Sequence, residues 1–114
     1  MEQGNVRIAA TGAKDIDVAA GRHADLLVAA CLAAAAQGDT AAYYDLGVAY
    51  STGSHGVGCD LVEAHKWFNL AAVAGHAESA WCRADIAEEM TAREIAEAQR
   101  RAREWLSAGA RKAA

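Results

Sequence analysis

Apolar residues recur at helical spacing over most of the chain after residue 20, and glycines mark where several of these runs stop. The first run predicts a helix over residues 23–37, because Gly38 stands where helices commonly end in a left-handed residue. Asp39 is a favourable N-cap for a second helix over Thr40–Thr52. The inner face predicted for this second helix consists of Ala42, Leu46 and Ala49 or Tyr50.

Two capping boxes predict where later helices begin. Asp60 with Glu63, and Thr91 with Glu94, have the spacing at which side chains and backbone satisfy each other's polar groups. After a glycine-rich loop over residues 53–59, the pattern predicts helices over 61–74, 77–89 and 92–108, the last closed by Gly109. The residues predicted to face inward are Leu61, Ala64, Trp67, Phe68 and Ala71, then Ala80, Trp81, Ala84 and Ala87, then Ile95, Ala98, Ala102, Trp105 and Leu106.

Five helices and no convincing strand predict an all-α fold, and the composition agrees. The 114 residues include 31 alanines, the best helix formers, and no proline, the residue that breaks helices. The larger apolar side chains are few, so closely packed helices must be filled mainly by the single Phe, three Trp and three Tyr. We expect a flexible leader over residues 1–20, one helical domain over 21–109 and a tail over 110–114.

The net charge of −4 argues against nucleic-acid or anionic-membrane binding across the whole surface. Arg100, Arg101 and Arg103 form a short basic cluster that is either a solvated helix face or a phosphate-binding patch. On a helix, residues four apart are neighbours, so Glu97 can pair with Arg101 and Arg100 can pair with Glu104. This pairing favours the solvated face.

The pattern of cysteines indicates the cellular compartment in which the protein is expected. Cys31, Cys59 and Cys82 are too far apart to suggest a disulfide framework or a zinc knuckle, which favours a reducing, cytoplasmic location. Residues 28–31 have the look of a lipoprotein processing site, but the apolar run before Cys31 begins only at Leu26 and is too short for a signal core. The full run over 26–36 is also too short to span a bilayer.

An internal repeat appears when Gly38 is placed on Gly75, a shift of 37 residues. Residues 32–39 (LAAAAQGD) then lie over residues 69–76 (NLAAVAGH), and Tyr44 lies over Trp81. A period of this length in an all-helical chain is typical of helix–turn–helix solenoids, in which neighbouring hairpins stack to bury their apolar stripes.

The stretch AYYDLGVAYSTGSHGVGCDLVEAHKWFNLAAVAGHAESA resembles a Sel-one-like repeat, a relative of the tetratricopeptide repeat. The tail DIAEEMTAREIAEAQRRAREWL resembles the atypical module that often closes bacterial arrays of this family, with Trp105 as its aromatic residue. The positions that match the repeat pattern are Ala42, Leu46, Gly47, Tyr50, Gly53, Gly56, Val57, Asp60, Ala64, Trp67, Ala71, Ala72 and Gly75.

The resemblance implies a short right-handed α/α solenoid with a capping hairpin over residues 77–109. It also implies a non-catalytic adaptor or scaffold that binds other proteins. The second unit departs from the pattern, since Arg83 and Ala84 stand where a full repeat has Leu-Gly. That departure suggests a terminal cap and not a surface for stacking further repeats.

Catalytic and metal-binding chemistry has little support in the chain. His55, Cys59 and His65 could converge on a metal, but a closed zinc site needs four ligands, and we expect His65 on the helix surface. Ser54 beside His55 has no evident acid or oxyanion partner, and Gly56–Gly58 lacks the lysine and strand of a phosphate-binding loop. We therefore expect no enzyme activity, cofactor, metal or small-molecule substrate.

Two modes of interaction remain open. The first is a peptide or helix of another protein on the inner surface of the second and fourth helices, for which Tyr43 is expected to point outward. The second is a homodimer through the first helix, whose face of Leu27, Cys31 and Ala34 has no preceding repeat to cover it. The contact residues predicted for the first mode are Tyr43, Asp45, Val48 and Trp81.

Overall fold

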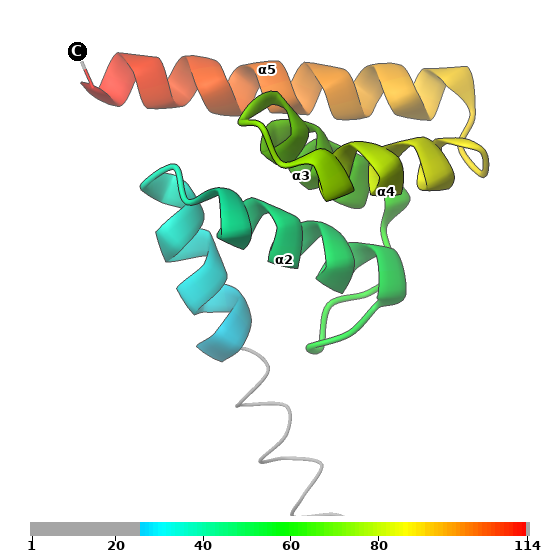
Figure 1. The fold of residues 1–114 in the computed structure, drawn as a ribbon, viewed down its shortest axis with the longest axis horizontal. Coiled ribbons are helices and arrows are strands. Elements are labelled where there is room, and N and C mark those ends of the chain that lie inside the picture. Colours follow the sequence, from blue (N-terminus) through cyan, green and yellow to red (C-terminus); the bar gives the residue numbers. More distant parts are fainter. Residues whose placement is uncertain (1–25, 114) are drawn as a thin grey trace, which may run out of the picture.

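Glycines and capping residues divide the chain into helices close to the predicted places. The computed structural model describes residues 26–113, a part that contains five helices and no strand (Figure 1). The predicted leader over residues 1–20 lies outside the described residues. The helices are a first helix through residues 26–36, then α2 (Thr40–Thr52), α3 (Leu61–Val73), α4 (Ala77–Ala87) and α5 (Ala92–Ala113).

The predicted caps form. The Asp39 carboxylate accepts hydrogen bonds from two backbone N–H groups in the first turn of α2. Thr91 and Glu94 make a complete capping box, with reciprocal hydrogen bonds of 2.8 and 3.1 Å. At α3 only half of the box is present: Asp60 accepts from the Glu63 N–H at 3.1 Å, whereas the Glu63 side chain turns toward α5.

The last helix is longer than predicted, and the expected stop at Gly109 is wrong. The backbone stays helical through Gly109 and α5 continues to Ala113. A glycine inside a helix costs about 1 kcal/mol, which the strong helix formers on both sides outweigh. By contrast, Gly38, Gly53 and Gly75 each adopt positive φ and follow a helix end, as a left-handed cap requires.

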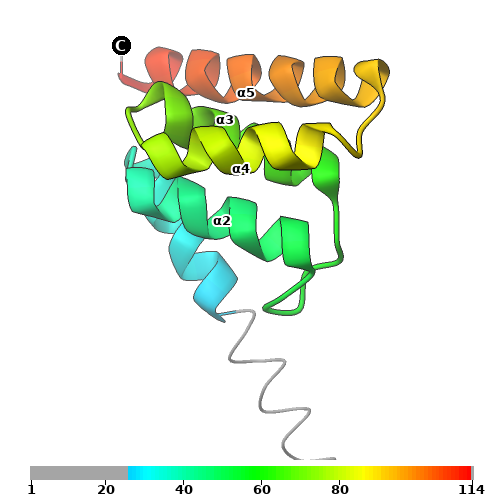
Figure 2. The same ribbon diagram turned by 45° about the vertical axis from the view of Figure 1, so that its right-hand side comes forward.

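Helix α3 is the common neighbour of the other labelled helices. It packs against α2, α4 and α5, so that α5 and α2 lie on opposite sides of it (Figure 2). The first helix crosses α2 and contributes Ala35 to the core. The main core cluster consists of Ala35, Ala42, Tyr43, Leu46, Trp67, Leu70, Ala71 and Ala102.

An aromatic group fills the space between α2, α3 and α5. Trp67, which is 1 % exposed, stacks on Tyr43 at 6.0 Å and meets Trp105 edge-on at 4.9 Å. The Trp105 indole N–H donates to the Tyr43 hydroxyl at 3.4 Å. The expected core positions of Trp67 and Trp105 are confirmed, whereas the expectation that Tyr43 points outward is wrong. Tyr43 is buried because it lies against Trp67 of α3 and Trp105 of α5 within the core cluster.

Gly47 lets α2 and α3 approach closely. A Cβ atom at this position would lie 2.5–2.9 Å from three ring atoms of Phe68, a side chain that is itself 2 % exposed. Glycine is therefore required here by packing and not by backbone conformation.

Helix α4 turns a different face to α3 than its apolar pattern predicts. Ser79 is fully buried and its hydroxyl lies 2.7 Å from His76 Nδ1, while Arg83 donates to Asn69 of α3. Trp81, expected to face inward, is instead 74 % exposed. Polar residues can occupy this contact because each finds a hydrogen-bond partner.

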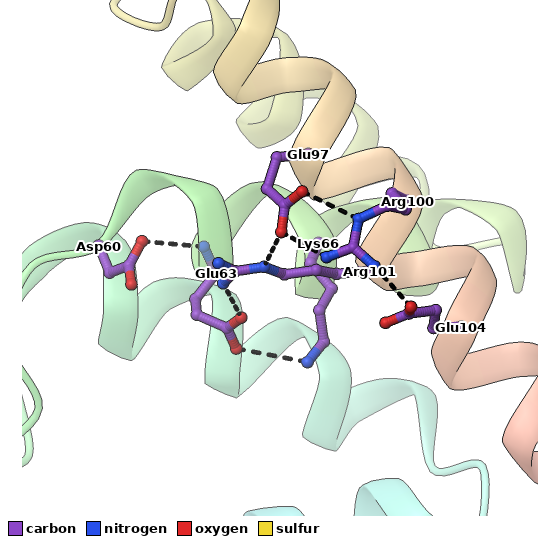
Figure 3. Close-up of polar contacts among 7 residues, drawn as sticks. All are labelled: Asp60, Glu63, Lys66, Glu97, Arg100, Arg101 and Glu104. Atoms are coloured by element: carbon purple, nitrogen blue, oxygen red, sulfur yellow. Dashed lines mark hydrogen bonds and ion pairs between the residues drawn. The ribbon is translucent and has the colours of Figure 1, made fainter.

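A network of charged side chains joins α5 to α3 (Figure 3). Arg101 binds Glu97 of its own helix at 2.8 Å and Glu63 of α3 at 2.7 Å. Arg100 pairs with Glu97 and Glu104 along α5, and Lys66 lies 4.1 Å from the centre of the Trp67 ring. These carboxylates form ion pairs with two of the three arginines that could have formed a phosphate-binding patch. This supports the interpretation of a solvated helix face.

Arg101→Gln is expected to lower the free energy of unfolding by about 0.5–1 kcal/mol, because the contact between α5 and α3 loses its cross-helix ion pair. The loss should shrink at high salt. Urea unfolding at low and high ionic strength measures both effects. Arg103→Gln on the same helix is the control, since Arg103 makes no ion pair among the described residues. An equal loss in both variants would contradict the bridging role.

Candidate interaction site

The first helix is unusual because residues 26–36 contain no polar or charged side chain. A helix that is apolar all round is normally buried. Among these eleven positions, however, Ala35 alone is buried, and Leu26, Leu27 and Leu32 are 70, 39 and 38 % exposed. The helix therefore brings two apolar grooves to the surface, one on each side.

The first groove, with a volume of about 380 Å³, lies between the first helix and α2. Its floor and walls are mostly apolar, and Asp45 is the charged group that lines it. We call it the α2 groove. Its lining residues are Leu27, Val28, Cys31, Tyr44, Asp45, Leu46, Val48, Ala49 and His55.

The second groove, of about 420 Å³, lies between the end of the first helix and the C-terminal half of α5. Trp105 and Leu106 form one wall, and small residues form much of the rest. Among the described residues no lysine, arginine or acid lines it, so the described lining offers no charged group to orient a partner. The α2 groove is the better candidate site because it combines an apolar floor with polar groups that could fix a ligand's orientation.

The α2 groove has a negative electrostatic field. Burial, and then the charges of Asp45 and Asp39, raise the pKa of the Cys31 thiol. Burial, then the charges of Glu78, Cys82 and Asp45, raise the pKa of Tyr44. The Tyr44 hydroxyl donates to Glu78 at 3.4 Å, which places a second carboxylate beside the groove. Burial and the neighbouring negative charges both favour the neutral forms of this phenol and thiol.

The structure brings together two of the four predicted contact residues. Asp45 and Val48 line the α2 groove, one helical turn apart on α2. Tyr43 lies in the core instead, and Trp81 is exposed on α4 without lining the groove. Sequence reasoning missed Tyr44, which packs against Phe68 and His76 and lines the groove.

The exposed face of the first helix also differs from the one predicted. Cys31 and Ala34 pack against the core cluster and are only partly exposed, so α2 covers this face. The exposed apolar residues are instead Leu26 and Leu32, together with the half-exposed Leu27 at the groove edge. The reason is that the first helix folds back over its own hairpin partner.

The residues considered for metal or catalytic chemistry do not form a cluster in the described part of the chain. His55 and Cys59 are exposed in the loop before α3, whereas His65 is 3 % exposed within α3, which corrects its expected surface position. In the part of the chain that the structure describes, no group of three His, Cys, Asp or Glu side chains is arranged to hold a metal ion. Ser54 accepts a hydrogen bond from the Thr52 hydroxyl at 2.9 Å.

The burial of His65 makes the stability of the fold depend on pH. Its Nδ1 atom is buried without a hydrogen-bond partner, and burial and then the charge of Arg83 lower its pKa from the ordinary 6.5. The unfolded chain binds a proton here below about pH 6.5, whereas the folded chain does so only at lower pH. Stability should therefore fall as the pH drops from 6.5 toward the folded pKa.

We expect the free energy of unfolding to decrease on acidification from pH 7.5 to 5.5, with a His65 contribution of at most about 1.4 kcal/mol per pH unit. His65→Leu should remove this part of the slope, whatever its effect at neutral pH. Denaturant unfolding of both proteins across the pH range measures it. A slope that is unchanged in the variant would show that His65 is not its source.

A comparison of the chain with protein families, curated proteins and solved structures finds no match. Within residues 26–113, none of the helices has the length and apolar character needed to cross a membrane.

Proposed function

We propose that this chain is a non-catalytic protein-interaction module of the Sel-one-like repeat type, built as a short right-handed α/α solenoid. Its α2 groove holds a peptide or helix of another protein. The proposal includes a cytoplasmic location, which rests on the cysteine usage. All three cysteines are free thiols in the described part of the chain.

Several of the repeat positions support this proposal. Gly47 allows close helix contact, Trp67 fills the space between hairpins, and Asp60 caps the helix after the loop. Ala64 and Ala71 are fully buried on α3. Buried alanines at the helix contacts are consistent with the alanine-rich composition of the chain.

The groove itself carries the functional part of the proposal. A surface channel of about 380 Å³ lies beside a helix with no polar side chain, and Asp45 and Tyr44 stand at hydrogen-bonding positions along it. Exposed apolar surface of this kind marks interaction sites in proteins, and an amphipathic helix laid in a groove is a common mode of recognition.

Val48→Asp is expected to abolish partner capture, because it places a charge on the apolar floor of the α2 groove. Quantitative affinity capture from the source cells, with wild type and variant side by side, measures the loss. Ala41→Asp is the matched control, since residue 41 is exposed on α2 outside the groove lining. Thermal melts verify that both variants fold. Equal capture of the same proteins by both variants would contradict the proposal.

A second candidate function, self-association through the first helix, is favoured by the exposure of Leu26 and Leu32. A homodimer would cover these side chains with the same helix of a second copy. Sedimentation velocity over a hundredfold concentration range tests it, with Leu32→Lys as the disrupting variant. A particle of 11.9 kDa at every concentration would exclude it.

A further inference from the structure

Among the described residues, carboxylates lie in and beside the α2 groove and no lysine or arginine lines it; His55 is the basic side chain in the lining. Asp45 lines the groove, and Glu78 is joined to it through the Tyr44 hydroxyl. Asp39, at the start of α2, contributes to the field at Cys31 inside the groove. Burial is the largest cause of the raised pKa values of the groove's phenol and thiol, and the charges of Asp45 and other neighbours add to it.

The one lysine or arginine between residues 26 and 82 lies elsewhere. Lys66 is held between Glu63 and the rings of Trp67 and Trp105, on the side of α3 that faces α5. Arg100 and Arg101 of α5 are engaged with Glu63, Glu97 and Glu104 in the same region. Asp45 itself is exposed and makes no ion pair with any described residue. The negative potential at the groove is therefore available to a partner.

We propose that the occupant of the α2 groove is a basic amphipathic helix of another protein, with its apolar side chains on Val28 and Val48 and a lysine or arginine on Asp45. This inference rests on the proposed function and deepens it by stating the partner's chemistry. The apolar floor accepts the hydrophobic stripe of such a helix. The acidic rim attracts its charged flank, accelerates encounter and disfavours acidic segments.

The test uses three synthetic amphipathic helical peptides with the same leucine stripe and a flank of lysine, glutamine or glutamate. Each is titrated into the full-length ¹⁵N-labelled protein, and amide chemical shifts locate the binding surface. The lysine peptide should bind most tightly and perturb Val28, Asp45 and Val48. Its affinity should fall steeply with added salt, because exposed charges are screened.

Asp45→Asn should weaken binding of the lysine peptide about two- to fivefold and leave the glutamine peptide unaffected. Asp85→Asn is the matched control, because it removes an equal charge from an exposed position on α4 outside the groove lining. An equal loss in both variants would show only general attraction between a cationic peptide and an acidic protein, and would overturn the inference.

The outcomes separate this inference from the proposed function. Equal binding of all three peptides at the α2 groove would retain the groove as an interaction site and overturn its preference for a basic partner. Binding of none of them at the groove would count against both. Concentration-dependent self-association that Asp45→Asn weakens would assign the groove to the arginine-rich α5 of a second copy, and so overturn the assignment to a separate protein.

Discussion

Trp67→Ala is expected to lower the free energy of unfolding by about 3–5 kcal/mol, the range typical of a buried tryptophan cut back to alanine. Trp67 is 1 % exposed and lies between α2 and α5, against Tyr43 and Trp105. The small alanines around it cannot expand to refill the cavity. Since domains of this size are stable by only about 5–15 kcal/mol, the substitution should remove a substantial part of the total stability.

Trp81→Ala is the matched control for this prediction, because it removes the same side chain from a position that is 74 % exposed. Its effect on stability should stay within about 0.5 kcal/mol. Chemical unfolding followed by far-UV circular dichroism measures both variants without relying on tryptophan fluorescence. Similar losses at the two sites would mean that Trp81 is packed in solution and that α4 sits differently from the arrangement described above.

Helix boundaries could be predicted well from the sequence because they depend on local chemistry. The N-cap Asp39 and the pair Thr91 and Glu94 satisfy backbone groups within three residues of themselves. Gly38 and Gly53 adopt a left-handed conformation that few other residues tolerate. Gly109 misled the prediction because a glycine in a strong helical context costs too little to end the helix.

The direction in which side chains point was harder to predict, because it depends on which neighbours cover each helix. Tyr43 was expected at the surface because only one face of α2 was predicted to be covered. Tyr43 is buried because Trp67 of α3 and Trp105 of α5 both lie against it. On α4, apolar spacing favoured Trp81 as the inward residue, whereas Ser79 is buried with its hydroxyl beside the N-cap His76, and Arg83 donates to Asn69 of α3.

The candidate site could be predicted only in part for the same reason. Asp45 and Val48 were predicted on a surface shared by the second and fourth helices, whereas the groove that they line lies between α2 and the first helix. The other wall of the groove comes from the first helix, and no pattern within α2 identifies it. The signal that was available is the run over residues 26–36 without a polar side chain. A small fold cannot bury every face of a helix of that composition, so part of its apolar surface stays exposed.

Gly47→Ala is expected to destabilise the protein by about 1–3 kcal/mol, although alanine is the better helix former. The new methyl group would lie 2.5–2.9 Å from three ring atoms of Phe68, so the ring or the helix axis must move. Phe68 is 2 % exposed and packs against Tyr44, which leaves the ring little freedom to rotate away. Steric overlap should therefore outweigh the gain in helix propensity.

Gly109→Ala makes the same substitution in a helix where nothing lies within 4 Å of the added Cβ atom. It should stabilise the protein by about 0.5–1 kcal/mol, so one chemical change should have opposite signs at two helical sites. Adding Phe68→Leu to Gly47→Ala should cost less than the sum of the two single changes, because the smaller side chain removes the overlap. Thermal unfolding of the four variants tests this, and additivity would show that close contact between α2 and α3 is not the reason for glycine at position 47.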